Sequence, residues 1–190
     1  LENPPEAFFC VSTDKAANPV NVMGATKKLM EETIMAYADR LPIKTARFAN
    51  VAFSNGSLPL GWLNRIDKRQ PLSCPLGIRR FFVSPIESGE LCLAASVLAE
   101  SGDIVYPKLD ESRDMIPFDA VVKDMLEDMG LGCRVCATTE EAKRGMADWN
   151  QKGRAGGGYP CEFFGSDTDG EKTFEEFYTN TDVKDAATFV

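Results

Sequence analysis

The sequence predicts an α/β protein with a parallel sheet, followed by a smaller α/β lobe. Two apolar runs, at residues 7–13 and 43–52, contain the aromatic and β-branched side chains that are typical of buried parallel strands. Between them, apolar residues recur at helical spacing over 24–41. A strand, a helix and a strand joined by short connections predict a βαβ unit with a right-handed crossover.

Each predicted element has a local reason. The run at 7–13, AFFCVST, is apolar up to its last two residues, and polar residues follow it at once. The helix over 24–41 stops before Pro42, which cannot continue it. A turn-prone segment, 54–57, follows the second strand. Shorter elements come next: helices at 59–68, 86–100, 118–129, from Thr138 onward and at 174–178, and strands at 72–75, 80–83, 103–109, 132–137 and from Tyr159 onward.

The chain divides into three predicted segments. Residues 1–57 carry the βαβ unit, residues 58–152 form the smaller lobe, and residues 153–190 form a C-terminal extension. The extension opens with the glycine-rich stretch 153–158, GRAGGG. This stretch follows no predicted strand and lacks the GxGxxG spacing of a dinucleotide-binding turn, so it is predicted to be an ordinary loop.

Charge and composition exclude several classes of function. The net charge is −8, from 29 acidic and 21 basic residues. This charge argues against a protein that binds along the phosphate backbone of a nucleic acid, but it is compatible with a basic pocket for one small anion. The sequence has no histidine, so histidine triads and histidine metal sites are excluded. No apolar run approaches the ~20 residues of a membrane span and no signal peptide opens the chain, so we expect a cytoplasmic location.

No metal site is predicted. The six cysteines are scattered among apolar residues and are expected to be reduced thiols. Cys133 and Cys136 have CxxC spacing, but no second pair completes a metal site, so packing of a short strand is favoured over zinc binding or redox chemistry. The segment from Asp167 to Gly170 resembles part of a calcium loop, but Gly165 would occupy the first ligand position, so a polar turn is predicted instead.

Five short segments in or beside the predicted strands carry the strongest functional signal. They are Ser12–Pro19 (STDKAANP), Asn21–Lys27 (NVMGATK), Arg47–Val51 (RFANV), Ser54–Ser57 (SNGS) and Arg80–Phe82 (RFF). In this order, over residues 7–130, they resemble the extended short-chain dehydrogenase/reductase superfamily. More narrowly, they resemble the UDP-N-acetylglucosamine 4,6-dehydratases of bacterial polysaccharide biosynthesis.

The resemblance implies a partial Rossmann-like fold. In that family the strand ending in Thr-Asp-Lys is a late strand of the Rossmann sheet, and the glycine-rich turn that binds NAD or NADP lies upstream of it. The chain is therefore expected to be the C-terminal portion of such an enzyme, with the last strands of the sheet in 1–57 and the substrate-binding lobe in 58–152. A protein that has lost its front half is an open alternative.

The resemblance assigns the chemistry of an elimination to the end of the first strand. Asp14 would be the acid that protonates the departing 6-hydroxyl of the sugar, and Lys15 the base that removes the C5 proton. Both roles require shifted pKa values, because at pH 7 an exposed aspartate is ionised and an exposed lysine is protonated. Thr13 would hydrogen-bond near the sugar 4-hydroxyl and the cofactor, and Lys27 would hold the nicotinamide ribose. The alternative for Asp14 and Lys15 is an ordinary solvated turn.

Met23 stands at the tyrosine position of the superfamily's YxxxK motif, four residues before Lys27. A thioether is too weak an acceptor to take up a proton. The NVMGATK segment resembles the larger members of the dehydratase group, in which methionine would be native here. The 4-hydroxyl proton would then leave through Thr13, a water or Lys15. Packing at the start of the helix is the structural alternative for Met23.

The substrate-binding residues that the resemblance implies come from four places. Asn50 would contact the diphosphate–sugar portion, and the turn at 54–57 offers N–H groups and hydroxyls to an anion, although the family usually has arginine at its second position. Arg80 would contact a phosphate directly, and Glu87 would support the uridine or sugar pocket. The full set is Asn50, Ser54, Asn55, Gly56, Ser57, Arg80 and Glu87.

The favoured hypothesis is the substrate-binding and partly catalytic portion of a NAD(P)-dependent UDP-sugar 4,6-dehydratase. A C4 epimerase or reductase of the same superfamily is a second hypothesis, against which Met23 and the Asp14–Lys15 pair count. A non-catalytic module that binds a UDP-sugar or serves assembly is a third. Because no glycine-rich nucleotide turn is found, we expect little turnover from this chain alone, and an exposed sheet edge predicts a homo-oligomer.

Overall fold

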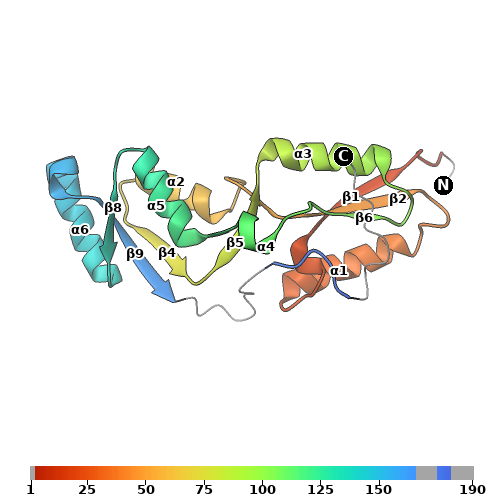
Figure 1. Cartoon of the computed structure of the whole chain (residues 1–190), viewed down its shortest axis with the longest axis horizontal. Helices are drawn as coiled ribbons and strands as arrows, with labels where there is room; N and C mark the ends of the chain where they lie inside the picture. Colours follow the sequence, from red (N-terminus) through yellow and green to blue (C-terminus); the bar gives the residue numbers. More distant parts are fainter. Residues whose placement is uncertain (1–2, 166–174, 181–190) are drawn as a thin grey trace. The chain divides into compact units, whose positions relative to one another are not determined.

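The computed structural model describes residues 3–165 and 175–180, which form two compact units (Figure 1). The first unit consists of the described residues up to Val51, Phe81–Asp114 and residues 175–180. The second consists of Ala52–Arg80 and the residues from Met115 to 165. Each unit is therefore assembled from segments far apart in the chain, whereas the sequence predicts continuous segments divided at residues 57 and 152.

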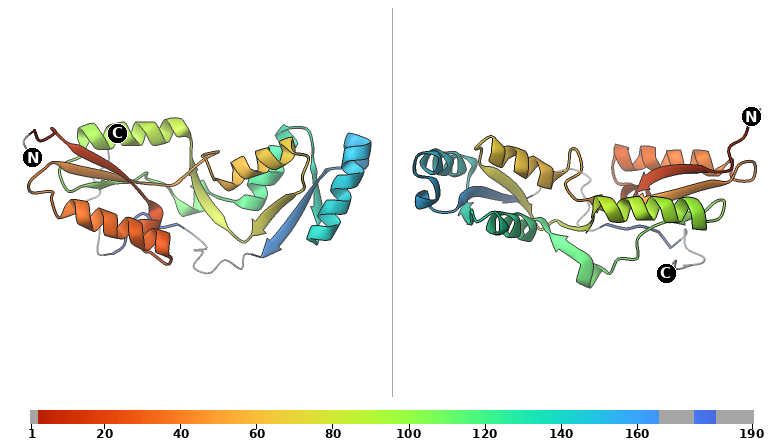
Figure 2. Two further views of the ribbon diagram at one scale, coloured as in Figure 1. Left: turned by 180° about the vertical axis from the view of Figure 1, so that it is seen from behind. Right: turned by 90° about the horizontal axis from the view of Figure 1, so that it is seen from above.

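The sheet of the first unit has three parallel strands in the order β1-β2-β6. β1 (Phe8–Thr13) pairs along its whole length with β2 (Ile43–Phe48), and β2 pairs with β6 (Ile104–Val105). Helices α1 (Val22–Met35) and α3 (Pro85–Leu98) lie on opposite faces of this sheet (Figure 1, Figure 2). The predicted βαβ unit and the α/β fold class are confirmed.

The core of the first unit lies between β2 and α3. Ala46 and Phe48 of β2 pack with Ala95, Ala99 and Val105 in one buried cluster. Small side chains on both elements let the helix approach the sheet, and burial of these apolar surfaces stabilises the arrangement. This packing holds the carboxyl ends of β1 and β2 in place, and the candidate site begins there.

The strand predicted over 43–52 is interrupted at Ala49. Beyond it, β3 (Asn50–Val51) leaves the main sheet and pairs in parallel with the end of β5 (Arg79–Val83), so that Asn50 lies opposite Phe82. The change of partner strand brings Asn50 beside residues that are distant in sequence.

The second unit contains a parallel sheet in the order β4-β9-β8. β9 (Tyr159–Gly165) is central and pairs with β4 (Leu72–Leu76) on one side and β8 (Cys133–Cys136) on the other. Trp62 and Leu126 are among its fully buried side chains. The remaining elements of the second unit are α2 (Leu58–Asp67), β7 (Met115–Pro117), α5 (Phe118–Asp128), α6 (Thr139–Lys152) and η2 (Gly153–Gly156). Those of the first unit are η1 (Asp14–Ala16) and α4 (Glu111–Asp114).

Three other predicted elements differ from the structure. α1 ends at Met35 and not at 41, because the following turns are closed by tighter i→i−3 hydrogen bonds such as that from Tyr37 N–H to the Ile34 carbonyl. The strand predicted over 103–109 is reduced to β6. The helix predicted at 174–178 is wrong over its described part, since residues 175–178 are not helical and instead contact distant strands. The segment from Asp167 to Gly170 lies outside the described residues.

Within 3–165 and 175–180, no helix is both long and apolar enough to cross a membrane. Cysteine, aspartate and glutamate side chains of these residues form no group of three that could hold a metal ion. All six cysteines are free thiols.

Candidate active site

Asp14 and Lys15 form an ion pair at the carboxyl end of β1. Both lie in η1, the single turn that follows Thr13. The Lys15 ammonium donates to both carboxylate oxygens of Asp14, at 3.1 and 3.3 Å, and the Thr13 hydroxyl donates to Oδ1 at 2.7 Å. The side chain of Asp14 is 5% exposed and that of Lys15 33%. The three residues predicted at this strand end are thus together, with a buried acid next to an amine that reaches the surface.

The first turn of α1 packs closely against this acid and amine. Gly24 is buried, and a Cβ atom at its position would lie 2.6 Å from the carbonyl oxygen of Lys15. Only glycine allows so short a distance. Asn21 begins the helix, and its side-chain oxygen accepts a hydrogen bond from the Gly24 N–H at 2.9 Å. The contact holds α1 against η1.

Met23 and Lys27 lie on α1 four residues apart, and therefore on one face of the helix. The Lys27 ammonium donates to the Val11 carbonyl of β1 at 3.5 Å, so it lies along the strand that ends in Thr13. Met23 is 46% exposed, so packing in the core of this unit does not explain why a methionine occupies this position. The YxxxK position is therefore occupied by a half-exposed thioether, one helical turn from the ammonium.

Asn50 is held by two partners that the sequence did not reveal. Its side-chain amide donates to the Phe81 carbonyl at 3.1 Å and also to the carboxylate of Glu175. The second oxygen of Glu175 accepts a hydrogen bond from the Phe81 N–H at 2.7 Å. Glu175, Asn50 and the β5 backbone therefore form one closed network, in which Asn50 orients an acidic group.

Glu175 is the functional candidate that the sequence analysis missed. Its carboxyl group is buried, and burial followed by the negative charge of Asp14 raises its pKa from 4.5 to about 7, against the opposing effects of the Phe81 N–H, Lys15 and Asn50. No motif marks it, because it lies in a short described segment far along the chain from Asp14. The only local signal is a pair of glutamates between two phenylalanines, Phe174 to Phe177, which resembles an ordinary amphipathic turn.

A buried ion pair fixes this segment to the first sheet. Arg47 of β2 donates to both carboxylate oxygens of Glu31, at 2.9 and 2.7 Å, and to the Phe177 carbonyl at 2.7 Å. Both charged side chains are almost fully buried. Removing either partner of such a pair would leave a buried charge without compensation. The bond from Arg47 to the Phe177 carbonyl ties the segment to β2.

Glu87 has a structural role in the first unit. It accepts a hydrogen bond from the Ser84 N–H at 2.6 Å, and the Ser84 hydroxyl accepts one from the Glu87 N–H at 3.1 Å. These two bonds form a capping box at the start of α3 and lower the pKa of the exposed Glu87 carboxyl. The role of Glu87 in a substrate pocket stays a prediction.

The second unit carries the other predicted substrate residues. In the turn at 54–57, Gly56 has a φ of 80°, which glycine adopts without strain, and the Ser57 hydroxyl caps α2. Arg80 is buried, donates to the Arg79 carbonyl at 2.9 Å and lies 6.0 Å from the ring centroid of Phe118. The Arg80 side chain is therefore packed against other residues of this unit. Its contact with a phosphate stays a prediction.

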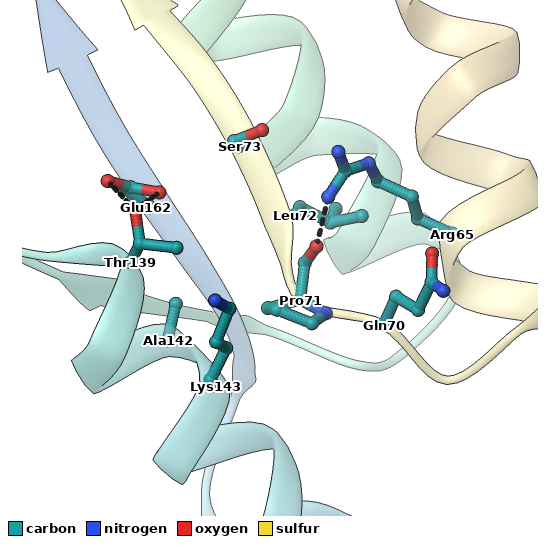
Figure 3. A pocket seen from close by; sticks show the side chains of 9 residues that line it. All are labelled: Arg65, Gln70, Pro71, Leu72, Ser73, Thr139, Ala142, Lys143 and Glu162. Atoms are coloured by element: carbon teal, nitrogen blue, oxygen red, sulfur yellow. Dashed lines mark hydrogen bonds between the residues drawn. The ribbon is translucent and has the colours of Figure 1, made fainter.

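A pocket of about 470 Å³ also lies in the second unit (Figure 3). Arg65 and Lys143 bring positive charge to it and Glu162 negative charge. Arg65 donates to the Pro71 carbonyl at 3.1 Å, and the Thr139 hydroxyl donates to both oxygens of Glu162 at 2.8 and 3.0 Å. None of the predicted site residues lines this pocket, and its mixed charges assign no ligand to it.

Comparison with known proteins places this geometry in a family. A family model described as "Polysaccharide biosynthesis protein" matches residues 2–189. The probable polysaccharide biosynthesis protein EpsC of Bacillus subtilis (strain 168) is 29% identical over 181 residues, which cover 94% of this chain and 26% of EpsC. The UDP-glucose 4-epimerase of Rickettsia bellii (strain OSU 85-389) is 35% identical over 104 residues, which cover 52% of this chain and 30% of the epimerase.

Solved structures share the fold. Pen from Bacillus thuringiensis has a TM-score of 0.69 at 22% identity, over 93% of this chain and 48% of that one. The dTDP-glucose 4,6-dehydratase of Bacillus anthracis, solved in complex with NAD, has a TM-score of 0.58 at 13% identity, over 86% of this chain and 51% of that one. The expected Rossmann-like architecture is confirmed, and the chain spans about half the length of these structures and a smaller share of the curated relatives.

Proposed function

Since this chain belongs to the polysaccharide biosynthesis protein family and has the fold of nucleotide-sugar epimerases and dehydratases, we propose that it is the substrate-binding and acid–base part of a UDP-sugar 4,6-dehydratase, with a UDP-N-acetylglucosamine-type substrate. The observation that carries the proposal is the Asp14–Lys15 pair at the end of β1. A dehydration at C5 and C6 needs a base and an acid close together, and this pair contains both.

The pair reaches its working form by moving one proton. In the ion pair, Lys15 is an ammonium and Asp14 a carboxylate, which is the wrong state for both roles. Transfer of one proton along the 3.1 Å hydrogen bond gives a neutral amine and a carboxylic acid together.

The elimination then balances within the site. The C5 proton of the 4-keto sugar passes to Lys15 Nζ, the C5–C6 double bond forms, and the C6–O bond breaks as Asp14 gives its proton to the departing hydroxyl, which leaves as water. Asp14 ends as a carboxylate and Lys15 as an ammonium, which restores the observed ion pair. The Thr13 hydroxyl, bonded to Asp14 Oδ1, holds the carboxyl in orientation.

NAD or NADP would supply the hydride chemistry that makes the 4-keto group and later reduces C6. The donor set on this chain fits the nicotinamide ribose end of such a cofactor. Lys27 brings an ammonium and Thr13 a hydroxyl to the last residues of β1, and the buried Ser12 hydroxyl beside them has no hydrogen-bond partner within the described residues. Lys27 and Thr13 would hold and orient that end of the cofactor.

The predicted substrate contacts remain part of the proposal. The side-chain NH₂ of Asn50 is hydrogen-bonded to Phe81 and Glu175. We therefore assign its side-chain carbonyl oxygen to the contact with the diphosphate–sugar portion of the substrate. The turn at 54–57 and Arg80 would bind phosphate oxygens. Glu87 would act only through the N-terminus of α3, which it caps.

An epimerase is the second candidate, favoured by the 35% identity to the Rickettsia bellii enzyme. Met23 argues against it, because C4 epimerisation relies on a proton acceptor at this place and a thioether is a weak acceptor. A non-catalytic UDP-sugar module is the third candidate. It would bind the UDP-sugar without releasing water or a proton from C5.

The test is turnover by the full-length protein with NAD and UDP-N-acetylglucosamine. A product lighter by one water, lost when Asp14→Asn or Lys15→Met is introduced and kept in the exposed control Lys108→Met, supports the dehydratase. A product of unchanged mass and altered C4 configuration supports the epimerase. Tight binding without any product supports the module.

We also propose that the first unit self-associates. β1 is an edge strand, and Val11, Leu93 and Val97 on β1 and α3 are exposed by 48%, 68% and 73%. Edges and apolar faces of this kind favour pairing with a second copy. A monomer at all concentrations in analytical ultracentrifugation would contradict this.

A further inference from the structure

Glu175 is a buried carboxyl group that the proposed elimination does not use. It is 7% exposed. Its Oε1 accepts a hydrogen bond from the side-chain NH₂ of Asn50, and its Oε2 accepts one from the Phe81 N–H at 2.7 Å. Burial of a carboxyl group costs stability unless hydrogen bonds compensate it, and these two donors do so on both oxygens.

The segment that carries Glu175 is held to the first unit by Phe177. The Phe177 carbonyl accepts a hydrogen bond from Arg47 of β2 at 2.7 Å. The Phe177 ring stacks on the ring of Tyr106, with the centroids 6.1 Å apart. These contacts keep Glu175 beside Asn50 independently of the hydrogen bond between the two side chains.

The network fixes the orientation of the Asn50 side chain. A side-chain amide has an NH₂ that donates and a carbonyl oxygen that accepts, and a rotation of the amide by half a turn exchanges the two. The Asn50 NH₂ donates to the Phe81 carbonyl at 3.1 Å and to Glu175. The exchanged orientation would place the Asn50 oxygen against two acceptors. The NH₂ is therefore directed into the network, and the carbonyl oxygen is the atom that can accept a hydrogen bond from a ligand.

A carboxylate satisfies both donors of this network, and an amide of the same shape does not. Glu175 turns one oxygen to the Phe81 N–H and the other to the Asn50 NH₂. A glutamine side chain has one acceptor oxygen, so one of the two donors would face its NH₂. The Asn50 amide would then be oriented by the Phe81 carbonyl alone.

We propose that Glu175 is a positioning residue that presents the carbonyl oxygen of Asn50 to the substrate, so that this contact requires a hydrogen-bond donor. The inference rests on the proposed function and narrows it. The diphosphate of a UDP-sugar offers only acceptor oxygens at neutral pH, whereas the sugar has hydroxyl groups and, in an N-acetyl sugar, an amide N–H. Asn50 therefore binds the sugar and not the diphosphate.

The first test observes the Asn50 amide without any ligand. Asparagine in the full-length protein is labelled with ¹⁵N, and the NH₂ signals of Asn50 are assigned by their loss in Asn50→Ala. Burial raises the pKa of Glu175 to about 7, so the spectra are recorded at a pH about one unit higher, where it is a carboxylate. We expect slow exchange of the Asn50 NH₂ hydrogens with water, at least tenfold faster in Glu175→Gln. Fast exchange in the wild type would overturn the inference, even if a variant failed to fold.

The second test measures which part of the ligand Asn50 binds. The full-length protein with NAD is titrated at the same pH with UDP-N-acetylglucosamine and with UDP in a calorimeter. Asn50→Ala and Glu175→Gln should each weaken binding of UDP-N-acetylglucosamine at least fivefold and change binding of UDP less than twofold. In the Asn50→Ala background, Glu175→Gln should have no further effect, because Glu175 acts through Asn50.

Glu176→Gln is the matched control in both tests. Glu176 is next in sequence and accepts a hydrogen bond from the Asn18 amide at 3.0 Å. Its substitution removes the same charge from the same segment but leaves the bonds between Glu175, Asn50 and Phe81 in place. It should leave both the exchange of the Asn50 NH₂ and the affinity for the two ligands as in the wild type.

Three outcomes of the titrations would overturn the inference. Equal weakening of both ligands in Asn50→Ala would put the contact on the diphosphate. Unaltered binding of UDP-N-acetylglucosamine in Glu175→Gln, or additive effects of the two substitutions, would remove the positioning role. A wild type that binds UDP-N-acetylglucosamine but releases no dehydrated product would refute the proposed dehydration instead, and the binding ratios would still decide the role of Glu175. No binding of UDP-N-acetylglucosamine by the wild type would refute both.

Discussion

Gly24→Ala tests whether α1 and η1 meet as closely as the site requires. The added Cβ would lie 2.6 Å from the Lys15 carbonyl oxygen and 3.2 Å from the Cβ of Pro19, so the helix or the turn must move. Overpacking of this kind costs about 1–3 kcal/mol, and the gain of up to about 1 kcal/mol that alanine brings to a helix offsets part of this cost. We expect a net loss of about 1 kcal/mol in the free energy of unfolding, measured by urea denaturation.

Gly89→Ala is the matched control for this substitution. Gly89 is a helical glycine of α3 in the same unit, and a Cβ there would meet no atom within 4 Å. It should gain about 0.5–1 kcal/mol, since only helix propensity and chain entropy change. Equal effects in the two variants, or a stabilised Gly24→Ala, would refute the close packing of α1 on η1.

Two further predictions follow from the ionisable groups. The pKa of Glu175 is raised from 4.5 to about 7, so the stability that its neutral form contributes is fully present below pH 4.5 and is lost as the pH rises to 7. At about 1.4 kcal/mol per pH unit, this loss in the free energy of unfolding is up to about 3 kcal/mol. In urea denaturation at a series of pH values, Glu175→Gln should remove this pH dependence. An equal slope in the variant would contradict it. Cys133 accepts a hydrogen bond from the Cys161 thiol, and this bond lowers the pKa of Cys133 to about 7. Iodoacetamide at neutral pH should therefore label Cys133 before the other cysteines of its sheet, as measured by peptide mass spectrometry. Cys161→Ala should slow the labelling of Cys133. Preferred labelling of Cys136 would contradict it.

Local patterns were sufficient to predict the first unit's βαβ element. The apolar run of β1, the helical spacing of the apolar residues in α1 and the apolar residues of β2 are each encoded within a few residues. The association of Thr13, Asp14 and Lys15 was predictable for the same reason, because consecutive residues at a strand end stay together. Ser84 and Glu87 have the spacing of a capping box, so the structural role of Glu87 could also have been found from the sequence.

Long-range pairings account for what the sequence did not reveal. β9 enters between β4 and β8 from far along the chain, and no periodicity indicates which strands will be its neighbours. The sequence did not reveal that the side-chain amide of Asn50 is hydrogen-bonded to Phe81 and Glu175, and its contact with substrate stays a prediction. Residues 174–178 were predicted to be helical, and the tertiary bonds of Phe177 to β2 and of Glu175 to β5 override that local preference.

The most direct test of the central claim, that Asp14 and Lys15 carry out an elimination, is turnover in D₂O. A dehydratase removes the C5 proton and returns one from solvent, so the 4-keto product of the full-length enzyme should carry deuterium at C5 and lack one oxygen at C6. Lys15→Met should abolish that product. A sugar inverted at C4 with no deuterium at C5, or undiminished incorporation in Lys15→Met, would contradict the assignment.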